Sequence, residues 1–334
     1  MRESLLDVLV CPDCQGELTL LPTRRSGDHI EEGSLKCRQC RRRFRIEHSV
    51  PNFVSEEDRG DVIQTTSGFA RNWNEFNEII LDNDGLNDEL FRDWIAPLDP
   101  EAMRGKLVLE PGCGMGRWLK VAARYDPRML IGLDYSAVAY TAARNVRDLP
   151  NVHVVRADIL RLPLKQKVEV AFCLGVIHHT PQPERSFKAL LEVLSSTGIL
   201  TVWVYGQENN GWIHRLITPI RVHITSKLPH RVLMSLSMLL TAPLCLAVAA
   251  SAVLPLPYRR YLRHLRRYPF RYMSHIVYDH LVPEIAHYLS RGELERWVAD
   301  ASLHAHLSER NGNSWRLLVS RVAGTLPSAL PRTG

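Results

Sequence analysis

The beginning of the chain lacks the long apolar stretch that a secretory signal needs. Arg2, Glu3 and Asp7 interrupt the first ten residues, so no continuous apolar segment forms there. The seven cysteines in 334 residues are therefore expected in a reducing compartment, where structural disulfides are rare. These absences argue against a secreted disulfide framework and predict a cytoplasmic protein.

The chain also lacks a strong excess of one charge. Its 42 basic and 36 acidic side chains give a net charge of +6, which is unevenly distributed. Basic residues gather at 36–45 and at 259–271, without an intervening acid in the second segment. Such runs most often form a solvated face, and they also suit contact with phosphate or anionic lipid.

A glycine-rich segment at 106–116 lacks the spacing of a dinucleotide-binding loop. That fingerprint, G-x-G-x-x-G, would require glycine at position 117, where the chain has arginine. Instead, an apolar run ends at Glu110 and is followed by three alternating glycines, Gly112, Gly114 and Gly116. Glycine lets a backbone approach a ligand closely, and N–H groups at the start of the next helix are free donors. The segment therefore predicts a buried strand followed by a ligand-binding turn.

Two later acids also follow short apolar runs. Asp134 lies 24 residues after Glu110, where the next strand of a βαβ unit should end. A carboxylate there can accept hydrogen bonds from both hydroxyls of a ribose; the alternative is a helix cap, a role that Ser136 would fill equally well. Asp158 follows a third run at 152–155, and solvation of a loop is its alternative.

Strands and helices continue to alternate beyond these acids. We expect two more parallel strands with a helix between them, then a helix and a hairpin across Asn311-Gly312-Asn313. The expected ranges are 168–175, 183–194, 198–205, 297–301, 304–309 and 315–320. This alternation predicts an α/β fold with a parallel core.

The E-x-G-x-G-x-G turn, the two acids and the order of strands resemble class I S-adenosylmethionine-dependent methyltransferases over about 106–206, and the final hairpin resembles theirs as well. The resemblance implies a Rossmann-like sheet of seven strands with a reversed last strand. It also implies S-adenosylmethionine as the cofactor, with Glu110 near the methionine ammonium, Asp134 at the ribose and Asp158 at the adenine amino group.

The same resemblance implies the other residues that contact the cofactor. They lie in the glycine turn, after the later strands, and in an aromatic lead-in at 69–76 that often folds over the cofactor in related enzymes. Arg71 is expected to face the cofactor's carboxylate, whereas packing alone is the alternative for Trp73 and Phe76. The full set is Arg71, Glu110, Gly112, Cys113, Gly114, Gly116, Asp134, Tyr135, Ser136, Asp158, Ile159 and Leu174.

The N-terminal region contains two C-x-x-C pairs separated by 22 residues, Cys11 with Cys14 and Cys37 with Cys40. Four thiolates from two short turns complete a tetrahedron around zinc. Redox chemistry would need only one pair, and a thioredoxin-like context is absent. A closed four-cysteine site has no open coordination position, so the pairs predict structural zinc without a catalytic role.

Residues 1–54 resemble the small zinc-binding activator subunit of tRNA and protein methyltransferases. Bacterial ribosomal RNA guanine methyltransferases also carry a zinc knuckle ahead of the same catalytic fold, so the resemblance identifies a module and not a substrate. The basic residues at 36–45 suit RNA phosphates, but Phe44 is the main aromatic residue nearby that could stack on a base. Scaffolding against the catalytic domain is therefore preferred over RNA contact.

A predicted insertion at 207–289 separates the fifth core strand from the last helix. Its segment 232–257 has no charged residue and is nominally long enough to cross a bilayer. A single crossing would separate the final hairpin from the sheet that it must join, and Pro243 predicts two short helices or a broken one. The segment is expected to be a lid over the acceptor, a contact with one membrane leaflet or a partner interface; buried core is the plain alternative.

Acceptor-side residues are expected at two places. His178 and His179 follow the fourth strand, where class I enzymes place residues that face the acceptor, and histidine can remove a proton from an oxygen or nitrogen. Tyr278 and His280 lie in a Tyr-Asp-His segment that resembles the acceptor side of small-molecule methyltransferases. A helix cap and polar surface explain that segment nearly as well.

These features divide the chain into a zinc module, an aromatic lead-in, a cofactor-binding core, the insertion, a last helix with its hairpin, and a flexible tail. The expected bounds are 1–54, 55–105, 106–206, 207–289, 290–322 and 323–334.

The leading hypothesis is methyl transfer to an oxygen or nitrogen of a small, apolar or lipid-linked acceptor, with peripheral membrane contact through 232–271 and with homo-oligomerisation left open. The first alternative is an RNA methyltransferase that docks through the zinc module. An Asn/Asp-Pro-Pro-Tyr motif is absent after the fourth strand, which weakens base-amino methylation. The second alternative is a non-enzymatic cofactor-binding partner or scaffold, against which the intact glycines and acids argue.

Overall fold

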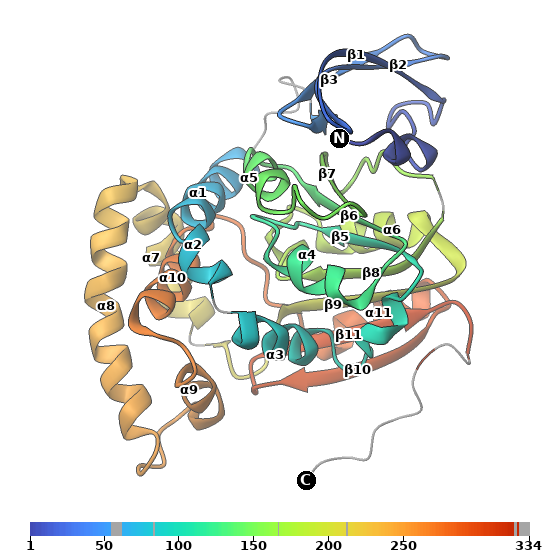
Figure 1. Cartoon of the computed structure of the whole chain (residues 1–334). Helices are drawn as coiled ribbons and strands as arrows, with labels where there is room; N and C mark the ends of the chain where they lie inside the picture. The colour runs from blue at the N-terminus through green and yellow to red at the C-terminus, as the bar shows by residue number, and fades with distance from the viewer. Residues whose placement is uncertain (55–61, 83, 166, 212, 324–325, 327–334) are drawn as a thin grey trace.

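The computed structural model describes residues 1–54, 62–82, 84–165, 167–211, 213–323 and 326. Within these ranges the strands form one eleven-stranded sheet in the order β1-β2-β3-β4-β7-β6-β5-β8-β9-β11-β10 (Figure 1). The strands are Leu18–Ser26 (β1), His29–Cys37 (β2), Arg43–Glu47 (β3), Val50–Asn52 (β4), Leu107–Pro111 (β5), Met129–Asp134 (β6), Val152–Arg156 (β7), Val168–Leu174 (β8), Leu194–Tyr205 (β9), His304–Arg310 (β10) and Ser314–Ser320 (β11).

The centre of the sheet is the predicted parallel core. Strands β7, β6, β5, β8 and β9 run parallel, and β11 inserts antiparallel between β9 and β10. The predicted α/β class and the reversed last strand are thus confirmed. The sheet has more than the predicted seven strands because the zinc module continues it, with Asn52 of β4 beside Arg156 of β7.

Helices cover both faces of the parallel strands and account for their continuous apolar sequences. The longer helices are Val62–Glu75 (α1), Asn77–Leu81 (α2), Asp84–Ile95 (α3), Arg117–Ala122 (α4), Val138–Asn145 (α5), Pro183–Val193 (α6), Thr218–His223 (α7), His230–Ala250 (α8), Arg259–Leu265 (α9), Phe270–Leu281 (α10) and Arg291–Asp300 (α11). Short helical turns occupy Glu3–Asp7, Pro100–Met103, Ala123–Tyr125, Ile177–His179, Ile213–Ile217 and Thr225–Lys227.

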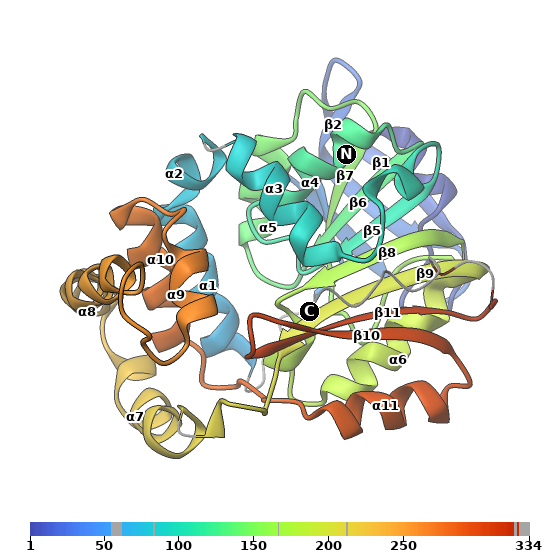
Figure 2. The ribbon, with the colours of Figure 1, turned by 90° about the horizontal axis from the view of Figure 1, so that it is seen from below.

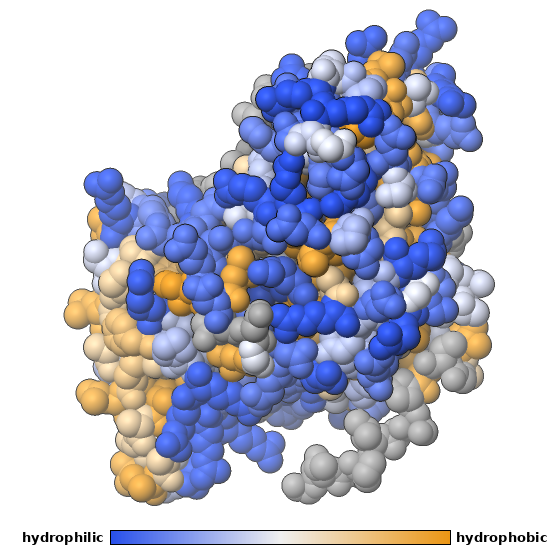
Figure 3. Space-filling view, viewed as in Figure 1, coloured by the Kyte–Doolittle hydropathy of each residue, from blue (hydrophilic) through white to orange (hydrophobic). Residues whose placement is uncertain are grey.

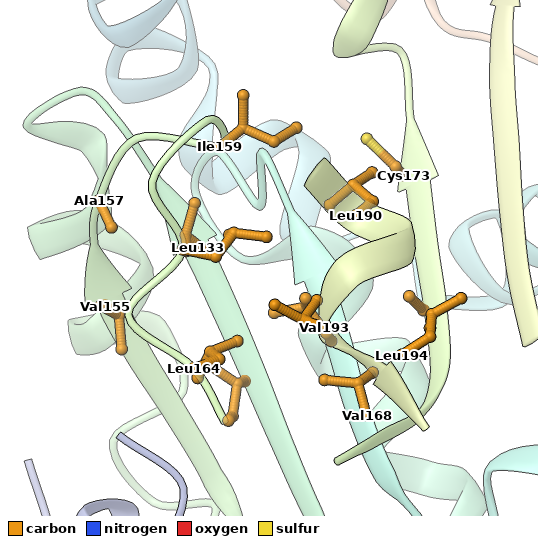
Figure 4. Packing of buried hydrophobic residues seen from close by; sticks show 14 of the residues in the cluster. Leu133, Val155, Ala157, Ile159, Leu164, Val168, Cys173, Leu190, Val193 and Leu194 are labelled. Atoms are coloured by element: carbon orange, nitrogen blue, oxygen red, sulfur yellow. The ribbon is translucent and has the colours of Figure 1, made fainter. Parts of the chain in front are cut away.

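Two hydrophobic clusters lie on opposite faces of the sheet. Helices α3, α4 and α5 cover one face, and α6 and α11 cover the other (Figure 2). On the second face, Leu190 and Val193 of α6 pack among Leu133 and Val155 of the strands (Figure 4). The two packed layers hold the carboxyl ends of the strands in fixed positions, which is where a ligand site is expected in this class of fold.

The zinc module shares one of these clusters. Leu5, Leu9 and Ile30 are buried in the same cluster as Leu164 of the core. The backbone adds a bridge between Leu9 and Leu164, and the N–H of Val10 donates to the carbonyl of Pro163 at 3.0 Å. The module is therefore packed onto the catalytic domain, as scaffolding requires.

Helices α7 to α10 form the insertion and stand beside the core (Figures 1 and 2). Helix α8 runs without interruption from His230 to Ala250, so the predicted break at Pro243 is wrong. Pro243 lies on the exposed side of the helix together with Leu239, whose carbonyl loses its hydrogen-bond donor. Water can solvate that carbonyl, which explains why the helix continues.

Candidate active site

A cavity of about 710 Å³ lies between the carboxyl ends of the core strands and the insertion. Its core side includes Gly112, Asp134 and Asp158, and its insertion side includes Tyr261 and His280. The insertion therefore forms part of the wall of the cavity that the glycine turn also lines.

The glycine turn has a backbone that other residues would not adopt. Gly112, Gly114 and Gly116 have φ angles of 72°, 53° and 85°, in the left-handed region that favours glycine. A Cβ atom on Gly112 would lie 2.2 Å from a methyl carbon of Val176. The turn thus needs glycine both for its conformation and for its close contact.

Asp134 is half-buried at the wall of the cavity and is held by three donors. Its Oδ2 accepts from the N–H of Gly114 at 2.9 Å, and its Oδ1 accepts from the N–H and Oγ of Ser136 at 2.9 and 2.8 Å. Burial raises the pKa of the carboxyl, while these hydrogen bonds act to lower it. The carboxylate is fixed in place and retains lone pairs for ribose hydroxyls.

Glu110 fits the cofactor's ammonium. The side chain is 2% exposed, and its Oε2 has no hydrogen-bond partner among the described residues. Burial raises the pKa of Glu110 well above its usual range, opposed by the charge of Arg117. An ammonium group is the kind of donor that would satisfy this oxygen.

Most of the predicted cofactor residues are brought together. The cavity wall includes Gly112, Cys113, Gly114, Asp134, Tyr135, Ser136, Asp158, Ile159 and Leu174. Glu110 and Gly116 lie outside the lining, Glu110 at the end of β5 and Gly116 at the N-cap of α4. The roles of these residues toward the cofactor stay predictions.

Arg71 lies elsewhere. It is exposed on α1 and does not line the cavity. Arg117 lines the cavity instead: its guanidinium lies 3.7 Å from the ring centre of Trp118 and donates to the hydroxyl of Tyr272. In the sequence, position 117 is marked only as the place where a dinucleotide-binding loop would have glycine, so no local pattern predicts this cation.

The two histidines after β8 have different environments. His178 is fully buried, does not line the cavity, and packs with its ring centre 4.2 Å from that of Tyr205. His179 lines the cavity, and its Nδ1 lies 2.8 Å from the carbonyl of Ile285. Because a carbonyl only accepts, Nδ1 carries the proton and Nε2 is left as an acceptor. Burial lowers the pKa of His179 to about 3, so the ring is neutral.

The Tyr-Asp-His segment on α10 is also divided. Tyr278 is buried away from the cavity, with its hydroxyl 2.7 Å from Nδ1 of His230, whereas His280 lines the cavity. Asp279, which the sequence interpretation did not select, lines it too and accepts a hydrogen bond from Nδ2 of Asn72. Burial raises the pKa of Asp279 to about 7. A carboxyl that titrates near neutrality is suited to general-base catalysis.

Much of the cavity wall is aromatic. It is lined by Trp94, Trp203, Tyr205, Tyr261, Tyr268, Tyr272 and Tyr288. The rings of Trp94 and Trp203 lie 4.4 Å apart, centre to centre. Such walls suit a planar acceptor group that stacks on aromatic side chains.

The four cysteines of the zinc module meet at one point. The Sγ atoms of Cys11, Cys14, Cys37 and Cys40 all lie within 4.8 Å of one another. Four thiolates at this separation suit one zinc ion with no open position. Asp13, between the first two cysteines, pairs with Arg42 at 2.7 Å and with Arg161 of the loop after β7. The metal turn is thereby tied to the wall of the catalytic domain.

Two families match separate parts of the chain. Residues 108–198 match the family described as "Methyltransferase domain", and residues 2–49 match the family described as "Trm112p-like protein". The probable tRNA methyltransferase 9B of Mus musculus is 34% identical over 108 residues, which cover 31% of this chain and 23% of that protein. The tRNA U34 carboxymethyltransferase of a Sulfurovum strain is 29% identical over 33% of this chain and 37% of its own length.

The matched stretches span well under two thirds of these relatives. Among solved structures, the magnesium protoporphyrin IX methyltransferase of Synechocystis with bound SAH has 12% identity and a TM-score of 0.45, and covers 78% of this chain and 97% of that one. A SAM-dependent methyltransferase of Aquifex aeolicus has 15% identity and a TM-score of 0.40, over 70% of this chain and 98% of that one.

The family matches, the order of the strands and the geometry of the four cysteines all indicate a methyltransferase domain with a zinc module. The matched methyltransferase domain contains the glycine turn, Asp134 and Asp158, and the Trm112p-like match contains all four clustered cysteines. S-adenosylmethionine is therefore the cofactor, and the non-enzymatic alternative loses its basis. Residues 108–198 thus form a methyltransferase domain with the class I, S-adenosylmethionine-dependent fold, and residues 2–49 form a Trm112p-like module with a four-cysteine cluster suited to zinc.

Proposed function

We propose that the chain methylates a nucleoside of RNA, with tRNA as the first substrate to test. The observation that carries the proposal is the aromatic wall of the cavity, which the glycine turn also lines. A base that leaves its stack can enter such a cavity and stack on aromatic rings, whereas a paired base cannot reach it. The names of the two curated relatives add support, because both refer to tRNA.

The zinc module offers a surface for the RNA backbone. Arg38, Arg41, Arg42, Arg43 and Arg45 are exposed there. Three of them are paired with acids, Arg38 with Glu17, Arg42 with Asp13 and Arg45 with Glu47. Arg41 and Arg43 have no ion-pair partner among the described residues, so they are the better candidates for phosphate contacts.

The chemistry requires alignment and removal of one proton. When bound, the cofactor supplies an electrophilic methyl group, and Glu110, Asp134 and Asp158 would hold its ammonium, ribose and adenine. The chain must then orient an acceptor oxygen or nitrogen. Asp279 would remove its proton as a carboxylate, and Nε2 of His179 would accept a hydrogen bond that orients it.

This proposal reverses the preference drawn from the sequence, which placed a small-molecule acceptor ahead of RNA. The curated relatives support the RNA alternative better, and the aromatic cavity is compatible with it. Cytoplasmic location belongs to the same proposal. Homo-oligomerisation stays a prediction.

The test is methyl transfer from labelled S-adenosylmethionine to a cell extract that is separated into RNA, lipid and small-molecule fractions. We expect nuclease-sensitive label in RNA, and none with an Asp134→Asn variant that still folds. Label confined to lipid or small molecules would contradict RNA as the acceptor.

A small apolar acceptor at a membrane surface is the second candidate, and the outer face of α8 favours it. Among the described residues α8 is the one helix long and apolar enough to cross a membrane, with 22% of its most apolar stretch buried. Leu239, Leu246 and Val253 are 71%, 74% and 80% exposed, and apolar surface covers this side of the molecule (Figure 3). The nearby exposed residues Arg260 and Arg263 suit anionic headgroups.

Liposome flotation separates the two candidates. Deleting 232–257 would remove buried residues such as Leu233 and Val248, so a triple substitution of Leu239, Leu246 and Val253 by serine is the better variant. Membrane contact predicts that this variant stays at the bottom of the gradient while a Leu21→Ser control, altered in the zinc module, floats with anionic vesicles. Equal flotation of the unmodified chain, the triple variant and the Leu21→Ser control would contradict the membrane candidate.

A further inference from the structure

Arg221 of α7 is an unsatisfied cation at the wall of the cavity. The side chain is 1% exposed and lines the cavity. Its Nε and Nη2 atoms are buried and have no hydrogen-bond acceptor among the described residues. A guanidinium stays charged in proteins. Within the described part of the chain, its charge is therefore buried without an ion-pair partner.

The neighbours of Arg221 cannot supply that compensation. The electrostatic neighbours that it affects are three histidines and a tyrosine: His178, His179, His280 and Tyr205. Burial is the main cause that lowers the pKa of each histidine, and the charge of Arg221 adds to it.

The acids of the cavity are engaged elsewhere. Among its described lining residues the carboxylic acids are Asp134, Asp158 and Asp279. None of them forms an ion pair or a hydrogen bond with Arg221 among the described contacts. Asp134 bonds to Gly114 and Ser136, Asp158 bonds to Leu160, and Asp279 contacts Asn72 and His275.

The position of Arg221 is fixed by the surrounding structure. The hydroxyl of Thr225, one turn later, donates to the carbonyl of Leu281 at 2.8 Å and ties this segment to α10. Around the guanidinium, the ring of Tyr205 lies 5.8 Å from that of His280 and 5.6 Å from that of Tyr288, centre to centre. Arg221 therefore lies at a part of the cavity wall that is built mainly of aromatic and imidazole rings.

Burying an unpaired charge costs several kcal/mol in general, and a planar guanidinium fork matches the two oxygens of a carboxylate or phosphate. We infer that Arg221 binds an anionic group, carboxylate or phosphate, of the methyl acceptor, and that this group anchors the acceptor beside the aromatic wall while a different atom receives the methyl. His280 lines the same cavity, and its ring can donate a further hydrogen bond to the anion. The inference rests on the proposed methyl transfer only in naming the ligand as the acceptor.

The test uses three ring compounds that differ in charge: benzoate, phenyl phosphate and the neutral benzyl alcohol. Each is titrated by calorimetry into the full zinc-loaded chain saturated with S-adenosylhomocysteine. We expect at least one of the two anions to bind about tenfold or more tightly than benzyl alcohol, because a buried charge partner is worth at least that factor. The stronger of the two anions identifies the source as carboxylate or phosphate.

The matched variants are Arg221→Met, which keeps the length of the side chain without its charge, and Arg215→Met, which alters an exposed arginine outside the cavity. The preference for the anion should vanish in Arg221→Met and persist in Arg215→Met. Equal binding of all three compounds to the unmodified chain, or a preference that survives in Arg221→Met, would overturn the inference. If Arg221→Met fails to fold, the comparison of the three compounds on the unmodified chain decides alone.

Failure of the proposed function would look different. The affinity for S-adenosylhomocysteine is measured first, on the unmodified chain and on Arg221→Met. Equal affinities of the two proteins indicate that the cofactor site is intact. If the chain binds S-adenosylhomocysteine but shows no preference for anions, the Arg221 site is refuted and the methyltransferase assignment is unaffected.

Discussion

Asp279 and Arg221 illustrate how a residue gains a role from its surroundings. Asp279 follows a tyrosine that is buried away from the cavity, and its pKa of about 7 arises from its burial where the insertion packs against the core. Neither this burial nor the isolation of Arg221 has a local signature. The acids at or just after the carboxyl ends of β5, β6 and β7 could be predicted because strand, acid and spacing recur along the chain. The positions of residues on the insertion depend instead on how the insertion folds back against the core.

Asp279→Asn should abolish the pH dependence of catalysis near neutrality. In the free enzyme, kcat/KM should rise about tenfold per pH unit below about 7 and level off above it, because the base acts in its deprotonated form. The substitution should lower kcat by roughly 10²- to 10⁴-fold. A His179→Gln variant should keep the pH dependence. If His179→Gln loses it and Asp279→Asn keeps it, the histidine is the base.

Gly112→Ala should damage the cofactor site through a steric clash. Its Cβ would lie 2.2 Å from a carbon of Val176, and its φ angle is positive. We expect a loss of roughly 1–3 kcal/mol in the free energy of unfolding and weaker binding of S-adenosylhomocysteine, both measured by calorimetry. Gly105→Ala is the matched control, because Gly105 also has a positive φ but has no atom within 4 Å of its Cβ. Equal effects of the two substitutions would attribute the loss to backbone strain alone.

Elements of the parallel core were predictable because their signals are local. Apolar runs predicted strands β5 to β9. The Asn-Gly turn predicted the final hairpin, and its strand bounds agree with those of the structure to within one or two residues. Helix α8 was misjudged, since a proline inside an apolar stretch normally ends a helix. The exposure of Pro243 could not be read from an all-apolar segment in which no polar residue marks the outer face.

Pro243→Ala should stabilise α8. Alanine restores the missing N–H donor and has the highest helix propensity, so we expect a gain of about 1–3 kcal/mol in the free energy of unfolding. Chemical denaturation measures the change. Pro269 is the control, because it caps the N-terminus of α10 where its missing N–H costs little, and Pro269→Ala should change stability by less than about 1 kcal/mol. A destabilised Pro243→Ala variant would mean that proline is required at this point.

At the scale of the whole molecule, the zinc module and the catalytic domain form one continuous structure. They share a hydrophobic cluster, and β4 extends the catalytic sheet. The sequence indicated two modules from two separate patterns, but it carried no signal that their strands would join. The edge pairing depends on the three-residue strand β4, which is too short to predict from an alternation of residues.

Loss of zinc should therefore weaken the whole chain and not the module alone. Cys40→Ser should lower the free energy of unfolding by several kcal/mol, since metal binding contributes folding energy. Differential scanning calorimetry should record one transition at a lower temperature. Cys245→Ser, outside the cysteine cluster, should leave the midpoint nearly unchanged. A separate low-temperature transition in Cys40→Ser, with the main transition unaltered, would show that the module unfolds independently.

The most direct measurement is calorimetric titration of the zinc-loaded chain with S-adenosylhomocysteine. The glycine turn, Glu110 and Asp134 together predict saturable binding of one molecule per chain, greatly weakened in a folded Asp134→Asn variant. Absence of binding to the unmodified, folded chain, or full binding to Asp134→Asn, would contradict the cofactor site described above.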